Sequence, residues 1–209
     1  TAAGASAAGS HTGSLAGDYK VFKGAMRQCG AVMVESFEEL FDLAKTLSEQ
    51  PLAKQNAVAI VTNSGGPGVL SADYCEEFGV NLVSLREETL QKLEASGKMH
   101  PAYSRRNPLD LVGDALPERY KIAIETLLSE EYVQGLIVIQ CITTMTDSLE
   151  DAKIVLAARK KFPDKPIVCV FMGGKYTGEG VKLLLKHGVP EFNDPRKAVQ
   201  AMAALCGVL

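Results

Sequence analysis

From Asn56 onward, short runs of consecutive apolar residues alternate with longer stretches in which apolar residues recur every three or four positions. Continuous apolar runs are typical of parallel strands covered on both faces, and the longer spacing is typical of amphipathic helices. The predicted strands are Ala57–Thr62, Asn81–Ser84, Gly135–Gln140, Pro166–Phe171 and Val189–Glu191. The predicted helices are Gly66–Phe78, Pro117–Leu128, Thr146–Lys161, Tyr176–His187 and Asp194–Leu205. This order predicts an α/β fold with a doubly wound parallel sheet, whose strand-to-helix turns meet at one edge.

The residues before Asn56 predict a second, incomplete unit. They comprise a helix, a strand and a helix over Asp18–Cys29, Ala31–Val34 and Phe37–Ser48. These elements are too few to bury a core, so we interpret them as the end of a preceding α/β domain. The segment Glu49–Gln55, which contains Pro51, separates the two units. The alternative is that the first unit adds its strand to the edge of the second sheet.

The composition is that of a globular protein and limits the partners. Of the 209 residues, 46% are hydrophobic and 22% are charged, close to the average for folded domains. The net charge is −3 and no basic run follows a phosphate backbone, so we expect no nucleic-acid partner. The longest apolar stretch, Gly135–Ile142, is less than half the roughly 20 residues that span a bilayer, so we expect no membrane segment.

The cysteines indicate a cellular location, and the first residues indicate how the chain begins. The cysteines are odd in number and contain no CxxC pair: Cys29, Cys75, Cys141, Cys169 and Cys206. This pattern indicates reduced thiols and a cytoplasmic location. The chain starts at Thr1, and its first seventeen residues are rich in Ala and Gly without the pattern of a signal peptide. We therefore expect a piece of a longer chain.

His11 is the candidate catalytic residue. It lies in Ser10–Gly17 (SHTGSLAG), where small residues surround it. We expect such a segment to be mobile or tightly turned, and the imidazole to lie outside any core. A neutral imidazole nitrogen can attack phosphorus near pH 7. The composition leaves a plainer alternative open, which is a surface histidine in a Gly/Ser/Ala-rich linker.

A glycine-rich turn, Thr62–Val69 (TNSGGPGV), follows a predicted strand and opens a predicted helix. Glycines allow close approach of the backbone, and the free amides of a helix start form an anion site. Gly65 and Gly66 are therefore candidate phosphate-binding residues. The turn matches neither the Walker pattern nor GxGxxG, and the alternative is a tight turn that only lets helix and strand pack.

A second turn, Cys141–Asp147 (CITTMTD), also lies between a predicted strand and a predicted helix. Thr143 and Thr144 offer hydroxyl groups to an anion, and Thr146 is expected to cap the helix. We take Thr143 and Thr144 as candidate phosphate-binding residues. Ordinary helix capping explains these residues equally well.

Weaker signals lie elsewhere along the chain. The turn Phe171–Gly178 (FMGGKYTG) carries Lys175, which can meet an anion. Asp110 follows a proline in Asn107–Gly113, where a turn role explains it. His187 ends a predicted helix just before a glycine, which indicates a helix C-cap. No HExxH or similar metal motif occurs, so no metal site is predicted.

Several segments follow one another in a recognisable order along the chain: SHTGSLAG, VMVESFEELFDLAKTL, VTNSGGPGVLSAD, RNPLDLVGDA, ITTMTD and VFMGG. Together they resemble the ADP-forming acyl-CoA (acetyl-CoA) synthetases, in particular their alpha subunits, which are relatives of succinyl-CoA synthetase. Enzymes of this family form a nucleoside triphosphate from an acyl-CoA, a nucleoside diphosphate and phosphate. The resemblance covers essentially the whole chain.

The resemblance implies a domain organisation and a role for several residues. Residues 1–52 would be the C-terminal part of a flavodoxin-like CoA-ligase domain, and residues 53–209 a complete succinyl-CoA ligase, flavodoxin-like domain. The phosphorylated histidine of the family falls on His11, which would take phosphate from an acyl phosphate and carry it toward the nucleotide. A phosphate-facing helix N-terminus falls on the turn with Thr143 and Thr144.

The family's CoA-binding domain and ATP-grasp portion lie outside this sequence. The resemblance therefore implies that this chain alone binds no cofactor and is inactive. CoA, ADP or ATP, phosphate and Mg belong to the full enzyme, in which the CoA-binding domain and the ATP-grasp domain or subunit are partners in an oligomer. Protein lysine acetyltransferases with the same domains offer the alternative, in which these domains form a regulatory, ligand-sensing platform.

Overall fold

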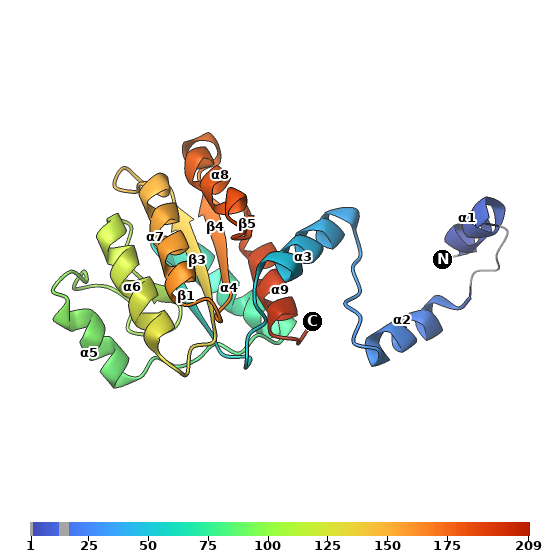
Figure 1. The fold of residues 1–209 in the computed structure, drawn as a ribbon, viewed down its shortest axis with the longest axis horizontal. Coiled ribbons are helices and arrows are strands. Elements are labelled where there is room, and N and C mark those ends of the chain that lie inside the picture. The colour runs from blue at the N-terminus through green and yellow to red at the C-terminus, as the bar shows by residue number, and fades with distance from the viewer. Residues whose placement is uncertain (1, 13–16) are drawn as a thin grey trace. The chain divides into compact units, whose positions relative to one another are not determined.

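The computed structural model describes residues 2–12 and 17–209, and its ribbon is drawn in Figure 1. The chain divides into two compact units, Thr1–Leu40 and Phe41–Leu209. The first unit holds α1 (Ala2–Thr12), α2 (Tyr19–Gln28) and the start of α3 (Phe37–Glu49). Asp18 caps α2, because its carboxylate accepts from the N–H groups of Lys20 and Val21.

Two predictions for the first unit are wrong. Residues 31–34 form no strand, because a strand is stable only beside another, and the described residues before Val58 contain none. Residues 10–12 are not a loop, since they form the last turn of α1. Alanine is the strongest helix former, and the Ala-rich start extends the helix through His11. Residues 13–16 of the predicted SHTGSLAG loop lie outside the described residues.

The second unit is built on a parallel sheet with the strand order β2-β1-β3-β4-β5. Its strands are β1 (Val58–Thr62), β2 (Leu109–Asp110), β3 (Gly135–Cys141), β4 (Ile167–Met172) and β5 (Glu191–Phe192). Its further helices are α4 (Gly65–Phe78), α5 (Glu87–Ala95), α6 (Pro117–Ser129), α7 (Ser148–Lys161), η1 (Gly174–Tyr176), α8 (Gly178–Lys186) and α9 (Pro195–Leu205). The order 2-1-3-4-5 is that of flavodoxin-like folds, so the predicted doubly wound sheet is confirmed.

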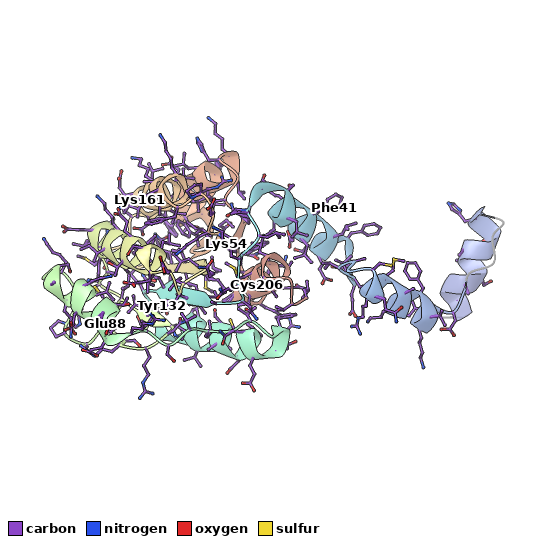
Figure 2. All side chains as sticks on the ribbon, turned by 60° about the horizontal axis from the view of Figure 1, so that its bottom comes forward. Phe41, Lys54, Glu88, Tyr132, Lys161 and Cys206 are labelled. Carbon is purple, nitrogen blue, oxygen red and sulfur yellow. The ribbon has the colours of Figure 1, made fainter. Side chains whose placement is uncertain are left out.

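Helices cover both faces of this sheet. The helices α4 and α9 lie together on one face, and α6, α7 and α8 lie side by side on the other (Figure 1). All five residues of β1 are consequently buried, as are all but the last residue of β3 and of β4. Side chains fill the space between these layers, whereas Phe41 on α3 is 69% exposed (Figure 2).

The edge of the sheet beside β1 differs from the prediction. The predicted strand Asn81–Ser84 is wrong, because only Leu82 forms a bridge, with Val58. The edge position farther along β1 belongs to β2, which pairs with Val61 and Thr62. Between the two pieces, Asn107 takes the place of a strand. Its Nδ2 donates to the carbonyls of Val58 (2.9 Å) and Val83 (3.0 Å), and its Oδ1 accepts from the Ile60 N–H (2.9 Å).

The chain between the two edge pieces contains α5, which was not predicted. Leu90 and Leu93 of α5 are buried, and two glutamates occupy its first turn. The three-residue spacing and the acidic start are ordinary helix signals, so this helix was visible in the sequence.

The segment after α3 is fastened to the second unit. The Gln50 side chain, 6% exposed, donates to the Gly188 carbonyl (2.6 Å) and accepts from the Ile167 N–H (3.0 Å). Arg159 donates to the carbonyls of His187 and Glu49. The first residues after α3 are therefore part of this unit's structure.

Candidate functional site

Three turns lie next to one another at the carboxyl edge of the sheet. They follow β1, β3 and β4, which are neighbours in the strand order and parallel. The register pairs Thr62 with Ile139 and Cys141 with Met172, so the strands end at nearly the same level. In doubly wound folds, ligands bind at this edge. The predicted convergence of the three turns is confirmed.

The β1–α4 turn leaves the start of α4 open. Ser64 is the N-cap residue, but its side chain makes no capping hydrogen bond. Its N–H instead donates to the Thr62 hydroxyl, which donates in turn to the Ser64 carbonyl. Gly65 and Gly66 are exposed, and they occupy the first helical positions, whose N–H groups have no partner within a helix. These amides can meet an anion.

Asp110 lies against this turn. A Cβ atom on Gly65 would come within 3.2 Å of the Asp110 Oδ2, so the glycine allows the carboxylate to approach. The other oxygen, Oδ1, accepts from the Val112 N–H at 2.9 Å. Val112 has a φ of 71°, which is strained for a β-branched residue. The predicted turn role of Asp110 is confirmed, and its negative charge lies where an anion on α4 would bind.

Asn63, which is not among the predicted site residues, joins the first two turns. It is 2% exposed. Its Nδ2 donates to the Cys141 carbonyl (2.9 Å), and its Oδ1 accepts from the Cys141 N–H (2.8 Å). The available signal was a polar residue directly after a buried strand. Burial also raises the pKa of the Cys141 thiol.

The β3–α7 turn holds the two predicted threonines in different environments. Thr143 donates its hydroxyl proton to the Gly113 carbonyl at 3.0 Å and accepts from the Met145 N–H at 3.2 Å. The hydroxyl of Thr146 donates to the Thr143 carbonyl at 2.9 Å. Thr144 is exposed. Of the two candidates, Thr144 therefore offers the more accessible hydroxyl.

The N-cap of α7 is Asp147, so the expectation that Thr146 caps this helix is wrong. The Asp147 carboxylate accepts from the N–H groups of Leu149 (3.1 Å) and Glu150 (3.0 Å). Aspartate is a stronger N-cap than threonine, because its charge also interacts with the helix dipole. These two amides are already bonded, so the start of α4 is more open than the start of α7. The start of α8 also lacks a side-chain cap.

Charges of both signs surround the edge. Arg119 donates to the Leu111 carbonyl (2.9 Å) and to Asp114 (2.6 Å). The hydrogen bond from Arg119 is the main cause that lowers the pKa of Asp114, so this carboxylate stays ionised. Lys175 is exposed in the β4–α8 turn, 5.1 Å from the ring centre of Tyr176.

The histidines occupy three distinct places. His11 is exposed in the last turn of α1, in the first unit. His187 is the C-cap of α8, its Nδ1 lies 3.0 Å from the Leu183 carbonyl, and Gly188 follows with a φ of 68°. This confirms the predicted cap. His100 accepts from the Ala102 N–H through Nδ1 at 3.0 Å.

The described residues offer neither a metal cluster nor a membrane-spanning helix. Among residues 2–12 and 17–209, no group of three or more His, Cys, Asp or Glu side chains could hold a metal ion. Within the same part of the chain, no helix is long and apolar enough to cross a bilayer.

Comparisons with known proteins agree with this fold. The sequence model described as a Ligase-CoA domain matches residues 58–206, and one described as a succinyl-CoA ligase like flavodoxin domain matches residues 1–47. The acetate–CoA ligase [ADP-forming] I of Archaeoglobus fulgidus is 42% identical over 97% of this chain and 28% of its own length. The alpha subunit of acetate–CoA ligase [ADP-forming] II of Pyrococcus furiosus is 36% identical over 97% of this chain and 44% of its own length.

A solved structure is similar over all of the chain. It is the dinucleotide-forming acetyl-coenzyme A synthetase 1 of Ca. Korarchaeum cryptofilum in complex with phosphate and ADP, with a TM-score of 0.92 and 33% identity over 45% of that protein. The chain thus spans less than half the length of these relatives. Since the Ligase-CoA model covers most of the 209 residues, the chain belongs to the Ligase-CoA domain family.

Proposed function

We propose that this chain is part of an ADP-forming acid–CoA ligase, which interconverts acyl-CoA, ADP and phosphate with acid, CoA and ATP. The observation that carries the proposal is the 36–42% identity to two acetate–CoA ligases [ADP-forming] over 97% of the chain. Both relatives are named as ligases, which favours this activity over a ligand-sensing platform of an acetyltransferase.

His11 is the proposed phosphoryl carrier. Its exposure supports this role, because a carrier must be reached from outside its own helix. In the first transfer, a ring nitrogen attacks the phosphorus of an acyl phosphate, so that a P–N bond forms while the P–O bond to the acyl group breaks and a carboxylate leaves. In the second transfer, a terminal oxygen of ADP attacks the same phosphorus, and the neutral imidazole leaves.

The carboxyl edge of the sheet is the proposed phosphate site. The exposed Gly65 and Gly66 amides at the open start of α4 and the accessible Thr144 hydroxyl are donors suited to phosphate oxygens. Thr143 donates to the Gly113 carbonyl, so binding by its hydroxyl requires that proton to change partner. Asp110 lies beside Gly65, and we therefore expect the anion to bind on the Thr144 side of the turn pair.

Residues 1–52 and 53–209 are proposed as separate domains, and the two matched stretches, 1–47 and 58–206, support two domains. In the structure, residues 41–52 belong to the second compact unit, with Glu49 and Gln50 bonded to it. No described residue of Thr1–Leu40 is buried, and Tyr19, Val21 and Phe22 on α2 are more than half exposed. These apolar side chains suit a covering layer from further protein. A CoA-binding domain and an ATP-grasp domain or subunit are the proposed partners in an oligomer.

The cofactors follow from this organisation. CoA, the nucleotide and Mg are proposed to bind mainly on the partner domains, since this chain is expected to bind none of them alone. A cytoplasmic location is part of the proposal and is supported by the five free thiols.

Activity of the full-length gene product tests the proposal. His11→Asn should lower acyl-CoA-dependent formation of ATP from ADP and phosphate by more than roughly 1000-fold, because the nucleophile is lost. His187→Asn is the matched control, since His187 is also exposed at a helix end and should leave the rate within about twofold. Normal turnover of the His11→Asn protein would refute the role of His11, and absence of the reaction in the unaltered protein would refute the ligase activity.

A further inference from the structure

Two polar side chains meet in the buried layer between β3 and α7. Gln140 is 0% exposed and Asp151 is 1% exposed. The Nε2 of Gln140 donates to the Oδ2 of Asp151. The second oxygen of each group, Oε1 of Gln140 and Oδ1 of Asp151, has no hydrogen-bond partner among the residues that the structure describes. Two buried acceptors therefore lack a donor, which is costly in a dry interior.

The surroundings of Asp151 disfavour a negative charge. Burial is the main cause that raises its pKa from 3.8 to about 7, with the Gln140 bond acting in the opposite direction and the charges of Asp147 and Glu150 adding to the rise. The fully buried Tyr120 of α6 is close enough to interact electrostatically with Asp151, and β3 contributes the neutral Gln140 carboxamide. Over the described chain, no cation contributes to the shift.

We propose that Asp151 is held as a neutral carboxylic acid whose hydroxyl donates to the Oε1 of Gln140, so that carboxyl and carboxamide form a reciprocal pair. One proton then supplies the missing donor. The proton is also needed if the Gln140 carboxamide is turned over, because its Oε1 would then face the Oδ2 of Asp151, and two acceptors cannot bond without a hydrogen between them. This inference concerns the buried layer alone and does not rest on the proposed function.

The pair makes Asp151 a positioning residue for the edge turn. Asp151 lies in the first turns of α7, and Gln140 directly precedes Cys141 at the end of β3. The Asn63 side chain bonds both the N–H and the carbonyl of Cys141. The reciprocal pair fastens the start of α7 to the end of β3. Loss of the proton removes one of its two hydrogen bonds and leaves a buried charge, so the β3–α7 turn should loosen as the pH rises.

Carbon-13 NMR of the Asp151 carboxyl group in the 209-residue chain tests the proton directly. The signal is assigned by its disappearance in Asp151→Asn. We expect it to titrate with a midpoint near pH 7, as the raised pKa indicates. A midpoint near 4, the ordinary range for aspartate, would overturn the proposal.

Stability across pH gives an independent test. Asparagine at 151 donates permanently to Gln140 through Nδ2, so Asp151→Asn keeps both hydrogen bonds at every pH. The folded pKa is raised, so the contribution of the neutral acid is complete below about pH 3.8 and is lost as the pH rises to about 7. In that window, the folding equilibrium constant of the unaltered chain should fall up to about tenfold per pH unit relative to Asp151→Asn. Asp151→Ala should be less stable than Asp151→Asn throughout, and parallel curves for the unaltered chain and Asp151→Asn would contradict the proposal.

Discussion

Removal of the Asn107 side chain should destabilise the second unit more than its exposure suggests. Asn107 completes the edge of the sheet between Leu82 and β2, with three hydrogen bonds to strand backbone. In Asn107→Ala, the N–H of Ile60, a residue with 0% exposure, loses its acceptor, which costs about 1–3 kcal/mol. The Val58 carbonyl keeps the Val83 N–H at 3.1 Å, so its second bond adds only about 0.5–1 kcal/mol. Loss of the bond to the Val83 carbonyl adds about 0.5–1 kcal/mol more, so the expected loss is about 2–5 kcal/mol in total.

Asn81→Ala is the matched control for this variant. Asn81 is exposed, and its Nδ2 donates to the Asn56 carbonyl at 3.1 Å, so the same substitution should cost less than about 1 kcal/mol. Asn107→Asp should cost at least as much as Asn107→Ala, because it sets a carboxylate oxygen against the carbonyls of Val58 and Val83. Urea unfolding at pH 7 gives each free energy of unfolding from the midpoint and slope. Equal losses for Asn107→Ala and Asn81→Ala would refute the edge-filling role.

Other substitutions test the site and the segment that follows α3. Gly65→Ala should lower the free energy of unfolding by about 1 kcal/mol and weaken binding of inorganic phosphate, because the new Cβ lies 3.2 Å from the Asp110 carboxylate. Gly66→Ala is the control, since its Cβ meets no atom within 4 Å and should be tolerated. Phosphate titrations followed by amide NMR compare the two variants. Gln50→Ala should cost about 2 kcal/mol in urea unfolding through loss of two hydrogen bonds, and a cost below about 0.5 kcal/mol would show that this segment is not fastened. Val112→Gly should stabilise the unit by about 0.5–1 kcal/mol by relieving a φ of 71°, and a lower unfolding midpoint would contradict that strain.

The sequence was sufficient for the central architecture and less so for its edges. The three apolar runs that became β1, β3 and β4 stand out because helices bury both of their faces. The strand predicted at Val189–Glu191 lies at the edge and is shifted, since β5 spans Glu191–Phe192. The run at Asn81–Ser84 looks similar, yet it forms one bridge because a distant side chain, Asn107, bonds the neighbouring backbone. That replacement is a long-range contact, and hydrophobic periodicity carries no information on it.

At the candidate site, the sequence predicts where the turns lie but not which hydrogen bonds they form. The positions of the glycine and threonine turns follow from topology, which brings parallel strand ends to one edge. The individual bonds do not follow: the sequence does not reveal that Asp147 rather than Thr146 caps α7, or that Asn63 spans two turns. We expected His11 in a loop, but the alanines before it extend a helix through it. The high helix propensity of these alanines is a local signal that favours this helix.

The most direct test of the proposed function locates the phosphoryl group itself. The full-length protein would be incubated with acetyl-CoA and labelled phosphate, digested under alkaline conditions that preserve P–N bonds, and examined by mass spectrometry. We predict label on the peptide that contains His11, and none on the peptides that contain His100 or His187. A protein that turns over while His11 stays unlabelled, or that carries its label on another histidine, would contradict the account.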